Sequence, residues 1–204
     1  MPAPSHQAVD AAARIFELRG GVLRTSDALA TGIHRRTLYW MRDNGLLERL
    51  SRGVYHLTSH ELPAKPDVAA VMRRVPRAVL CLVSALDLHE VGTQIPGEVQ
   101  IALPRDVRPP RIDYPRMRVF HMSPASLAAG VEERGTEGRS LRVFNVAKTV
   151  ADCFKFRGSI GSDVAVEALQ EVIRERRAAP GDIMEYARLD RVQNVIRPYL
   201  EALL

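Results

Sequence analysis

The stretch LRTSDALATGIHRRTLYWMRDNGLLERLSRGVYHL, residues 23–57, carries the signals of two short helices followed by a hairpin. Thr25 and Ser26 are residue types that cap helix N-termini, and Gly32 tolerates the left-handed conformation of a tight turn. We therefore expect a short helix that starts near Thr25 and stops at Gly32. A second helix is expected directly afterwards, from His34 to Asn44.

The predicted second helix has two different faces. At helical spacing, Leu38 and Met41 share one face with His34. The residues that project from the opposite face are Arg35, Arg36, Tyr39 and Asp43. Trp40 lies on the flank, where we expect it to be partly buried or packed against the following hairpin.

Two short runs of strand-forming residues follow, at Leu46–Leu50 and Val54–Leu57. Ser51-Arg52-Gly53 joins them, with glycine where a three-residue hairpin requires positive φ. Arg49 and Arg52 then lie near the tip of a basic β-wing. Two helices joined by a tight turn and followed by such a wing predict a winged helix-turn-helix, whose second helix suits the DNA major groove while the wing reaches a phosphate strand.

We predict double-stranded DNA as the ligand of this unit, with the recognition helix on base edges and phosphates and the wing on the flanking backbone. An ordinary solvated face and a protein-docking role are the alternatives for the same pattern. The predicted DNA-binding residues are Thr25, Arg35, Arg36, Thr37, Tyr39, Arg49 and Arg52.

The 204-residue chain has a net charge of +5 that is spread unevenly. Residues 1–60 hold 8 Arg or Lys against 5 Asp or Glu, residues 61–122 hold 9 against 7, and residues 123–204 hold 12 against 12. The positive excess therefore lies in the first two thirds of the chain, as expected if the N-terminal part faces nucleic acid.

The location of the protein is inferred from its cysteines and its hydropathy. Cys81 and Cys153 lie in apolar patterns far apart in the sequence, which favours buried free thiols over a disulfide or a metal site. No apolar run is long enough to span a bilayer, and the first residues do not resemble a signal peptide. We expect a cytoplasmic protein without a membrane partner and without a cofactor.

The predicted fold class is α+β: an N-terminal winged helix-turn-helix and a mixed α/β C-terminal domain with a small sheet and several helices. The predicted boundaries are 1–60 for the DNA-binding domain, 61–66 for a proline-containing linker and 67–204 for the C-terminal domain. The expected elements are a first helix at 7–19, helices at 67–74 and 78–91, strands at 98–103 and 117–122, a hairpin at 131–144, helices at 146–156, 163–177 and 181–189, and a last helix to Leu204 capped by Asp190.

The chain shows no convincing catalytic constellation, so we predict that it is not an enzyme. Asp87, His89 and Glu90 project in different directions from one predicted helix and lack the i, i+4 spacing of a zinc helix. Asp106 and Asp113 have no strand-borne Glu-x-Lys companion of the kind that a nuclease would supply.

One basic cluster is left over, the segment Arg105-Asp106-Val107-Arg108-Pro109-Pro110-Arg111. A second DNA contact, a docking surface for an acidic partner and a merely soluble loop all fit it. The sequence does not choose among these three interpretations.

Four segments together resemble one known family. They are Asn44–Tyr55 (NGLLERLSRGVY), Ser84-Ala85-Leu86 ahead of Gly92, the strand end Ile101-Ala102-Leu103-Pro104, and Asn145–Asp152 (NVAKTVAD). Over about residues 8 to 190 the chain resembles the AbiEi antitoxins of type IV, or abortive-infection, toxin-antitoxin systems. Lys148 stands where the family pattern leads us to expect arginine, and Asp152 is left as either a structural cap or an interface residue.

The resemblance implies a transcriptional autorepressor that binds inverted repeats in its own promoter, as a monomer in solution or a dimer on DNA. It also implies a C-terminal domain for antitoxicity and assembly, and a cognate AbiEii-type nucleotidyltransferase toxin that is countered directly or indirectly. One alternative is a stand-alone winged-helix regulator with a ligand-sensing C-terminal domain. The other is a DNA nuclease, for which the sequence shows no matching nuclease residues.

Overall fold

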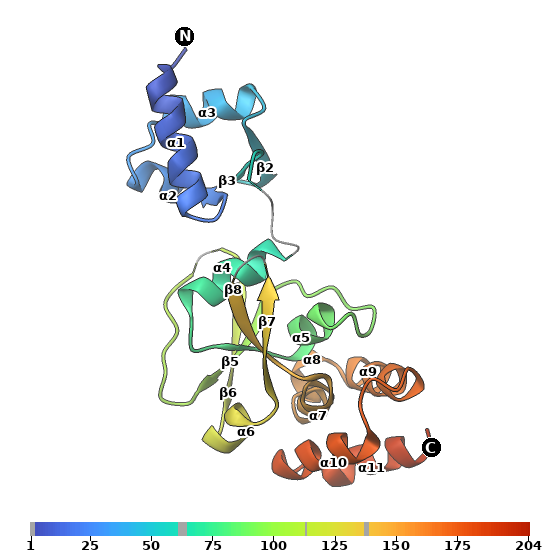
Figure 1. The fold of residues 1–204 in the computed structure, drawn as a ribbon. Helices are drawn as coiled ribbons and strands as arrows, with labels where there is room; N and C mark the ends of the chain where they lie inside the picture. Colours follow the sequence, from blue (N-terminus) through green and yellow to red (C-terminus); the bar gives the residue numbers. More distant parts are fainter. Residues whose placement is uncertain (1–2, 61–64, 113, 137–138) are drawn as a thin grey trace. The chain divides into compact units, whose positions relative to one another are not determined.

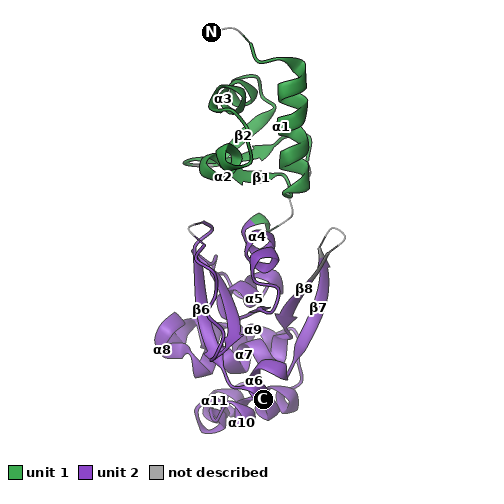
Figure 2. Cartoon of the chain, turned by 90° about the vertical axis from the view of Figure 1, so that its left-hand side faces the viewer, with its two compact units in different colours: residues 1–66 green, residues 67–204 purple. Residues whose placement is uncertain are grey.

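The computed structural model describes residues 3–60, 65–112, 114–136 and 139–204. The chain divides into two compact units, Met1–Pro66 and Asp67–Leu204 (Figure 2). Most of the predicted linker at 61–66 lies outside the described residues. The mixture of helices and sheets confirms the predicted α+β class.

Over its described residues, the N-terminal unit contains three helices and a three-stranded antiparallel sheet with strand order β1-β3-β2. Its helices are α1 (His6–Leu18), α2 (Thr25–Ala30) and α3 (Arg35–Asp43). Its strands are β1 (Val22–Arg24), β2 (Leu47–Ser51) and β3 (Val54–Leu57). The two helices and the wing were predicted, whereas β1 was not, because three residues are too few for a periodic signal.

The core of this unit forms where α1 covers the helix pair. The predicted first helix packs through one stripe, since Ala12 and Phe16 are buried and Val9 and Ala13 pack against the same cluster. The remaining buried apolar residues of the cluster are Leu23, Ala28, Ile33, Leu38, Met41, Leu47, Tyr55 and Leu57. Every described helix and strand of the unit contributes to this cluster, so α3 is held from behind on a single face.

The C-terminal unit is built on a five-stranded mixed sheet with strand order β6-β5-β4-β8-β7. Its strands are β4 (Val79–Leu80), β5 (Val99–Pro104), β6 (Met117–Met122), β7 (Val131–Thr136) and β8 (Arg139–Phe144). The two strands predicted at 98–103 and 117–122 are β5 and β6, which pair in parallel, and the predicted hairpin is the antiparallel pair β7 and β8. The turn of that hairpin, at 137–138, lies outside the described residues.

The helices of the C-terminal unit cover both faces of the sheet. They are α4 (Pro66–Arg74), α5 (Leu82–Leu88), α6 (Pro124–Ala128), α7 (Val146–Lys155), α8 (Arg157–Ile160), α9 (Ser162–Arg174), α10 (Pro180–Leu189) and α11 (Gln193–Glu201). Because strand side chains alternate between faces, Ala102 joins the core beneath α5, α7 and α9, whereas Ile101 and Leu103 join the core beneath α4. Figure 1 shows α7, α9, α10 and α11 gathered together.

Two predictions for this unit are wrong. The expected single helix at 78–91 is instead the short central strand β4 followed by α5, with Leu82 at a φ of +49°. An uninterrupted apolar run does not distinguish a buried strand from a buried helix. Asp190 does not cap the last helix, which begins at Gln193; it follows α10 and is buried at 7% exposure.

The predicted buried free thiols are confirmed, since Cys81 and Cys153 are both buried and not disulfide-bonded. Within the described residues, no helix is at once long enough and apolar enough to cross a bilayer.

Truncating Leu38 tests the packing that holds α3. We expect Leu38→Ala to lower the free energy of unfolding of the N-terminal unit by about 2–5 kcal/mol, because the fully buried side chain leaves a cavity. The chain contains one tryptophan, Trp40, which packs against this cluster, so urea unfolding followed by its fluorescence reports on this unit. Leu18→Ala, at a position 82% exposed, is the matched control and should change stability by less than about 0.5 kcal/mol. Equal effects of the two variants would contradict the packing described for α3.

Candidate DNA-binding surface

Helix α3 presents two arginines from its first turn. His34 caps the helix, its Nδ1 accepting a hydrogen bond from the Arg36 backbone N–H at 3.1 Å. Arg35 and Arg36 are both exposed, and among the residues that the structure describes neither guanidinium has an ion-pair partner. Leu38 and Met41 hold the opposite face in the core. The first turn of α3 therefore offers two positive charges that the protein itself does not neutralise.

The structure changes the roles expected for two other residues of α3. Thr37 is only 5% exposed, because it lies on the face that carries Leu38, so it has little surface to offer DNA. Tyr39 is half-buried against the core, and the Arg42 guanidinium lies 4.9 Å from its ring centroid. Arg42 in turn pairs with Asp43 at 2.6 Å. We therefore leave Thr37 out of the candidate surface and place Tyr39 at its edge.

The wing carries the remaining predicted contacts. Arg49 and Arg52 are exposed, and Gly53 has the positive φ expected of the hairpin turn, +75°. The register between β2 and β3 shifts between Arg49 and Ser51, which marks a β-bulge beside the tip. The wing thus places two further guanidinium groups on the surface of the unit.

Thr25 connects the wing to α2 and is not a free surface residue. Its backbone N–H donates to the Gly53 carbonyl at 2.8 Å, and its Oγ1 donates to the same carbonyl at 3.3 Å. Thr25 is half-buried by this contact. Its role in the structure is to fix the turn that carries Arg52 against the start of α2.

A second polar cluster, in the C-terminal unit, is largely buried. The Lys148 ammonium pairs with Asp152 one turn later on α7 and lies 3.0 Å from the Asp190 carboxylate. Lys155 reaches the other oxygen of Asp190 at 2.7 Å, and Ser126 donates to that same oxygen at 2.8 Å. We call these five residues the Lys148 cluster.

The Lys148 cluster perturbs the acidity of its two carboxyl groups in opposite directions. Burial raises the pKa of Asp152 well above its ordinary range, and the charge of Lys148 only partly opposes this. Burial would raise the pKa of Asp190 as well, but the neighbouring Asp152 and the Lys148 and Lys155 ammonium groups outweigh it and hold the pKa of Asp190 below its ordinary range. Since Lys148, Asp152 and Asp190 are buried, we assign the cluster to stability rather than to chemistry.

The sequence indicates only the part of this cluster that lies on α7. Lys148 and Asp152 stand four residues apart on an apolar helix, a spacing that places them side by side. No local signal connects them to Asp190, which lies 42 residues from Lys148. Asp152 is therefore a member of a buried ion cluster. This excludes the structural cap, one of the two roles left open by the sequence.

The other candidate groups stay apart. Arg105, Arg108 and Arg111 are exposed on the segment between β5 and β6, and Asp113 lies outside the described residues. His89 is buried and bonds the Phe144 carbonyl through Nε2 at 2.7 Å. In the part of the chain that the structure describes, His, Cys, Asp and Glu side chains form no group that could hold a metal ion.

Removing the charge of Asp190 should have a pH-dependent effect on the C-terminal unit. We expect Asp190→Asn to lower its free energy of unfolding by about 3 kcal/mol at pH 7, because two ammonium groups lose their shared carboxylate. The folded-state pKa of Asp190 is lowered, so its contribution is complete above the unfolded value near pH 4 and is lost as the pH falls below that value. Urea unfolding followed by circular dichroism at several pH values measures this.

The matched control for that experiment is Asp182→Asn, a change at an exposed position of α10, the helix that Asp190 follows. It should leave stability unchanged within about 0.5 kcal/mol at every pH. A difference between wild type and Asp190→Asn that grew toward acid would contradict the assigned direction.

Comparison with known proteins bears on the N-terminal unit. Residues 10–58 match the family described as "Transcriptional regulator, AbiEi antitoxin". The crystal structure of the RV2827C protein from Mycobacterium tuberculosis is similar over 100% of this chain and 82% of its own, with a TM-score of 0.48 and 18% sequence identity. No curated protein matches the sequence significantly.

The family match covers most of α1, the helix pair and the wing up to the end of β3. It confirms the resemblance to AbiEi antitoxins and the predicted winged helix-turn-helix, over a shorter stretch than the sequence suggested. The chain is therefore similar to the AbiEi antitoxin transcriptional regulators over residues 10–58, which lie within its N-terminal unit.

Proposed function

We propose that this protein is the antitoxin of a type IV toxin-antitoxin system, which binds inverted repeats in its own promoter and represses it. The observation that carries the proposal is the exposed pair Arg35 and Arg36, without ion-pair partners among the described residues, at the start of a helix buried on its other face. The family description, a transcriptional regulator and antitoxin, supports the same function.

The geometry of the N-terminal unit suits duplex DNA. An α-helix fits the major groove, and an arginine that donates two hydrogen bonds to guanine contributes about 1–3 kcal/mol of discrimination against other bases. In this proposal Arg35 and Arg36 occupy that groove, Tyr39 contacts its edge, and Arg49 and Arg52 hold the flanking phosphates. Thr25 acts indirectly, because its two contacts with Gly53 fix the turn of the wing.

The antitoxin part of the proposal assigns a separate task to the C-terminal unit. The family description supports an antitoxin, and the C-terminal unit has its own sheet and two cores, so it can supply a surface for antitoxicity and assembly. The proposed partner is a nucleotidyltransferase-like toxin, countered either in a direct complex or without stable contact. The repressor acts as a monomer in solution or as a dimer on its repeats, in the cytoplasm.

Promoter binding tests the first part of the proposal. We expect Arg35→Ala with Arg36→Ala to weaken binding to the protein's own promoter fragment by at least tenfold, because both groove contacts are lost. Fluorescence anisotropy with labelled duplex, at a fixed salt concentration, measures the change. Arg14→Ala removes an exposed arginine from α1 and serves as the control, with binding expected to stay within twofold.

The salt dependence of DNA binding distinguishes the proposed contacts of the wing from those of α3. Arg52→Ala should weaken binding to specific and unrelated duplexes alike and reduce the slope of log affinity against log salt by about 0.9 for one lost phosphate contact. Promoter binding that survives the double change in α3 would overturn the assignment of the recognition helix.

Toxin neutralisation tests the second part. Co-expression with the nucleotidyltransferase-like product of the adjacent gene should restore growth, and the Arg35→Ala with Arg36→Ala variant, expressed from a foreign promoter, should restore it equally. That variant is informative because it separates repression from antitoxicity. Co-purification of the two proteins distinguishes a direct complex from indirect action. Failure of the wild-type protein to restore growth would overturn the antitoxin assignment and leave the repressor.

A further inference from the structure

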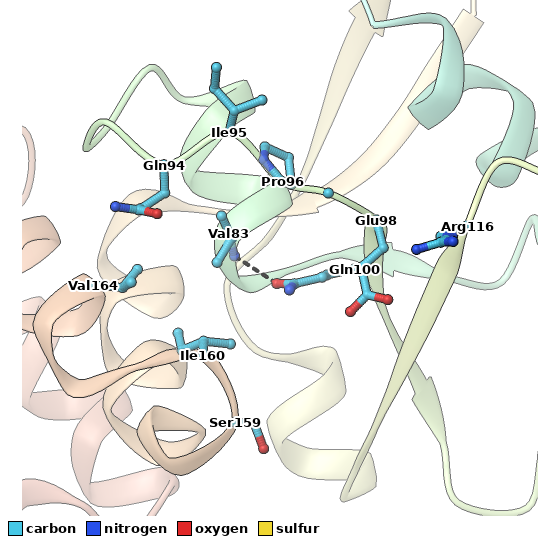
Figure 3. Close-up of a pocket in the computed structure, with 11 residues that line it drawn as sticks. Val83, Gln94, Ile95, Pro96, Glu98, Gln100, Arg116, Ser159, Ile160 and Val164 are labelled. Atoms are coloured by element: carbon cyan, nitrogen blue, oxygen red, sulfur yellow. Dashed lines mark hydrogen bonds between the residues drawn. The ribbon is translucent and has the colours of Figure 1, made fainter. Parts of the chain in front are cut away.

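The C-terminal unit contains a cavity of about 390 Å³ that the proposed function does not use. It lies between the beginning of α5, the segment at 94–98, strand β5 and the region where α8 leads into α9 (Figure 3). A volume near 400 Å³ is at the lower end of the range found for small-molecule sites. We call it the Gln100 cavity after the side chain on its floor.

Gln100 is held so that one polar group is left over. The side chain is 7% exposed, and its Oε1 accepts a hydrogen bond from the Val83 backbone N–H at 3.0 Å (Figure 3). Because a backbone N–H can only donate, Oε1 must face Val83, which leaves the amide nitrogen Nε2 as the other end of the group. The strand beneath it is fixed too, since the Gln100 N–H donates to Ser84 at 2.9 Å.

The Nε2 group of Gln100 is a hydrogen-bond donor without an acceptor among the described residues. It is also not one of the fully buried side-chain atoms without a partner, so it keeps some accessible surface. It must therefore reach open space, and the space that Gln100 lines is the cavity. A ligand atom that accepts a hydrogen bond would satisfy it without any rearrangement of the protein.

The charges around the cavity favour an anionic acceptor. Glu98 lines it, but the Arg118 guanidinium lies 3.7 Å from the Glu98 carboxylate and offsets its charge. Arg116 lines it as well and is exposed, with no ion-pair partner in the part of the chain that the structure describes. One positive charge is therefore left uncompensated at the cavity.

The rest of the wall is aliphatic. Val83, Ile160 and Val164 line the side formed by α5, α8 and α9. Ile95, which is 90% exposed, lines it from the loop on the other side. An aliphatic group placed among these branched side chains would remove apolar surface from water, at roughly 25 cal/mol per Å².

From this combination we infer that the Gln100 cavity binds a small carboxylic acid with a branched aliphatic group. The carboxylate accepts from Gln100 Nε2 and pairs with Arg116, and the aliphatic group lies against Val83, Ile160 and Val164. The inference does not rest on DNA binding, so it stands or falls separately from the proposed repressor function.

Three probes test the ligand class on the full-length protein by isothermal titration calorimetry. N-acetyl-leucine carries the carboxylate and the branched group, N-acetyl-leucinamide lacks the negative charge, and N-acetylglycine lacks the aliphatic group. We expect saturable binding of N-acetyl-leucine and at least fivefold weaker binding of each of the other two. Equal affinity for all three, or no saturable binding of N-acetyl-leucine at concentrations up to about 10 mM, would overturn the inference.

Two variants locate the site. Arg116→Gln should weaken N-acetyl-leucine about tenfold and leave N-acetyl-leucinamide unchanged, whereas Arg111→Gln, at an exposed arginine of the same loop outside the cavity, should change neither. Gln100→Glu keeps an acceptor for the Val83 N–H but replaces the donor that faces the cavity with an acceptor, so it should abolish binding of the carboxylate. Binding that is unaffected by both Arg116→Gln and Gln100→Glu would place the ligand elsewhere and overturn the assignment.

Discussion

A lysine ammonium enclosed by protein determines how the C-terminal unit is assembled. Lys148 has no exposed surface, and its ammonium group contacts Asp152 on its own helix and Asp190 after α10. Ser126 of α6 and Lys155 complete the cluster. The cost of burying a charge without partners is far larger than the stability of a typical domain, so these contacts must form together. The cluster therefore fixes α6, α7 and α10 in one arrangement.

The N-terminal unit, in contrast, exposes charged side chains on its surface. Helix α3 is short, and Leu38 and Met41 commit one face of it to the core. The guanidinium groups of Arg35 and Arg36 are then left on the surface, where the helix capped by His34 holds their backbone in place. The wing adds Arg49 and Arg52 through a turn that Thr25 fixes by two contacts to one carbonyl. A rigid support behind exposed charges is what recognition of a duplex requires.

The two units thus separate polar groups that the fold satisfies from groups that it leaves available. Lys148 pairs with Asp152 and Asp190 inside the protein, and we assign these contacts to stability. Arg35, Arg36, Arg116 and the Gln100 amide nitrogen have no such partner among the described residues, and each lies at a surface or a cavity.

The sequence by itself determined the elements whose signals are local. The helix pair, the wing around Arg52 and Gly53, the pairing strands at 98–103 and 117–122 and the family resemblance were all readable, because caps, glycines and periodicity act over a few residues. Only the tertiary structure decided that Val79 and Leu80 form a central strand, that Thr37 is buried and that Asp190 faces Lys148. Each of these depends on a partner distant in the sequence, and such a pairing leaves no mark on the residues beside it.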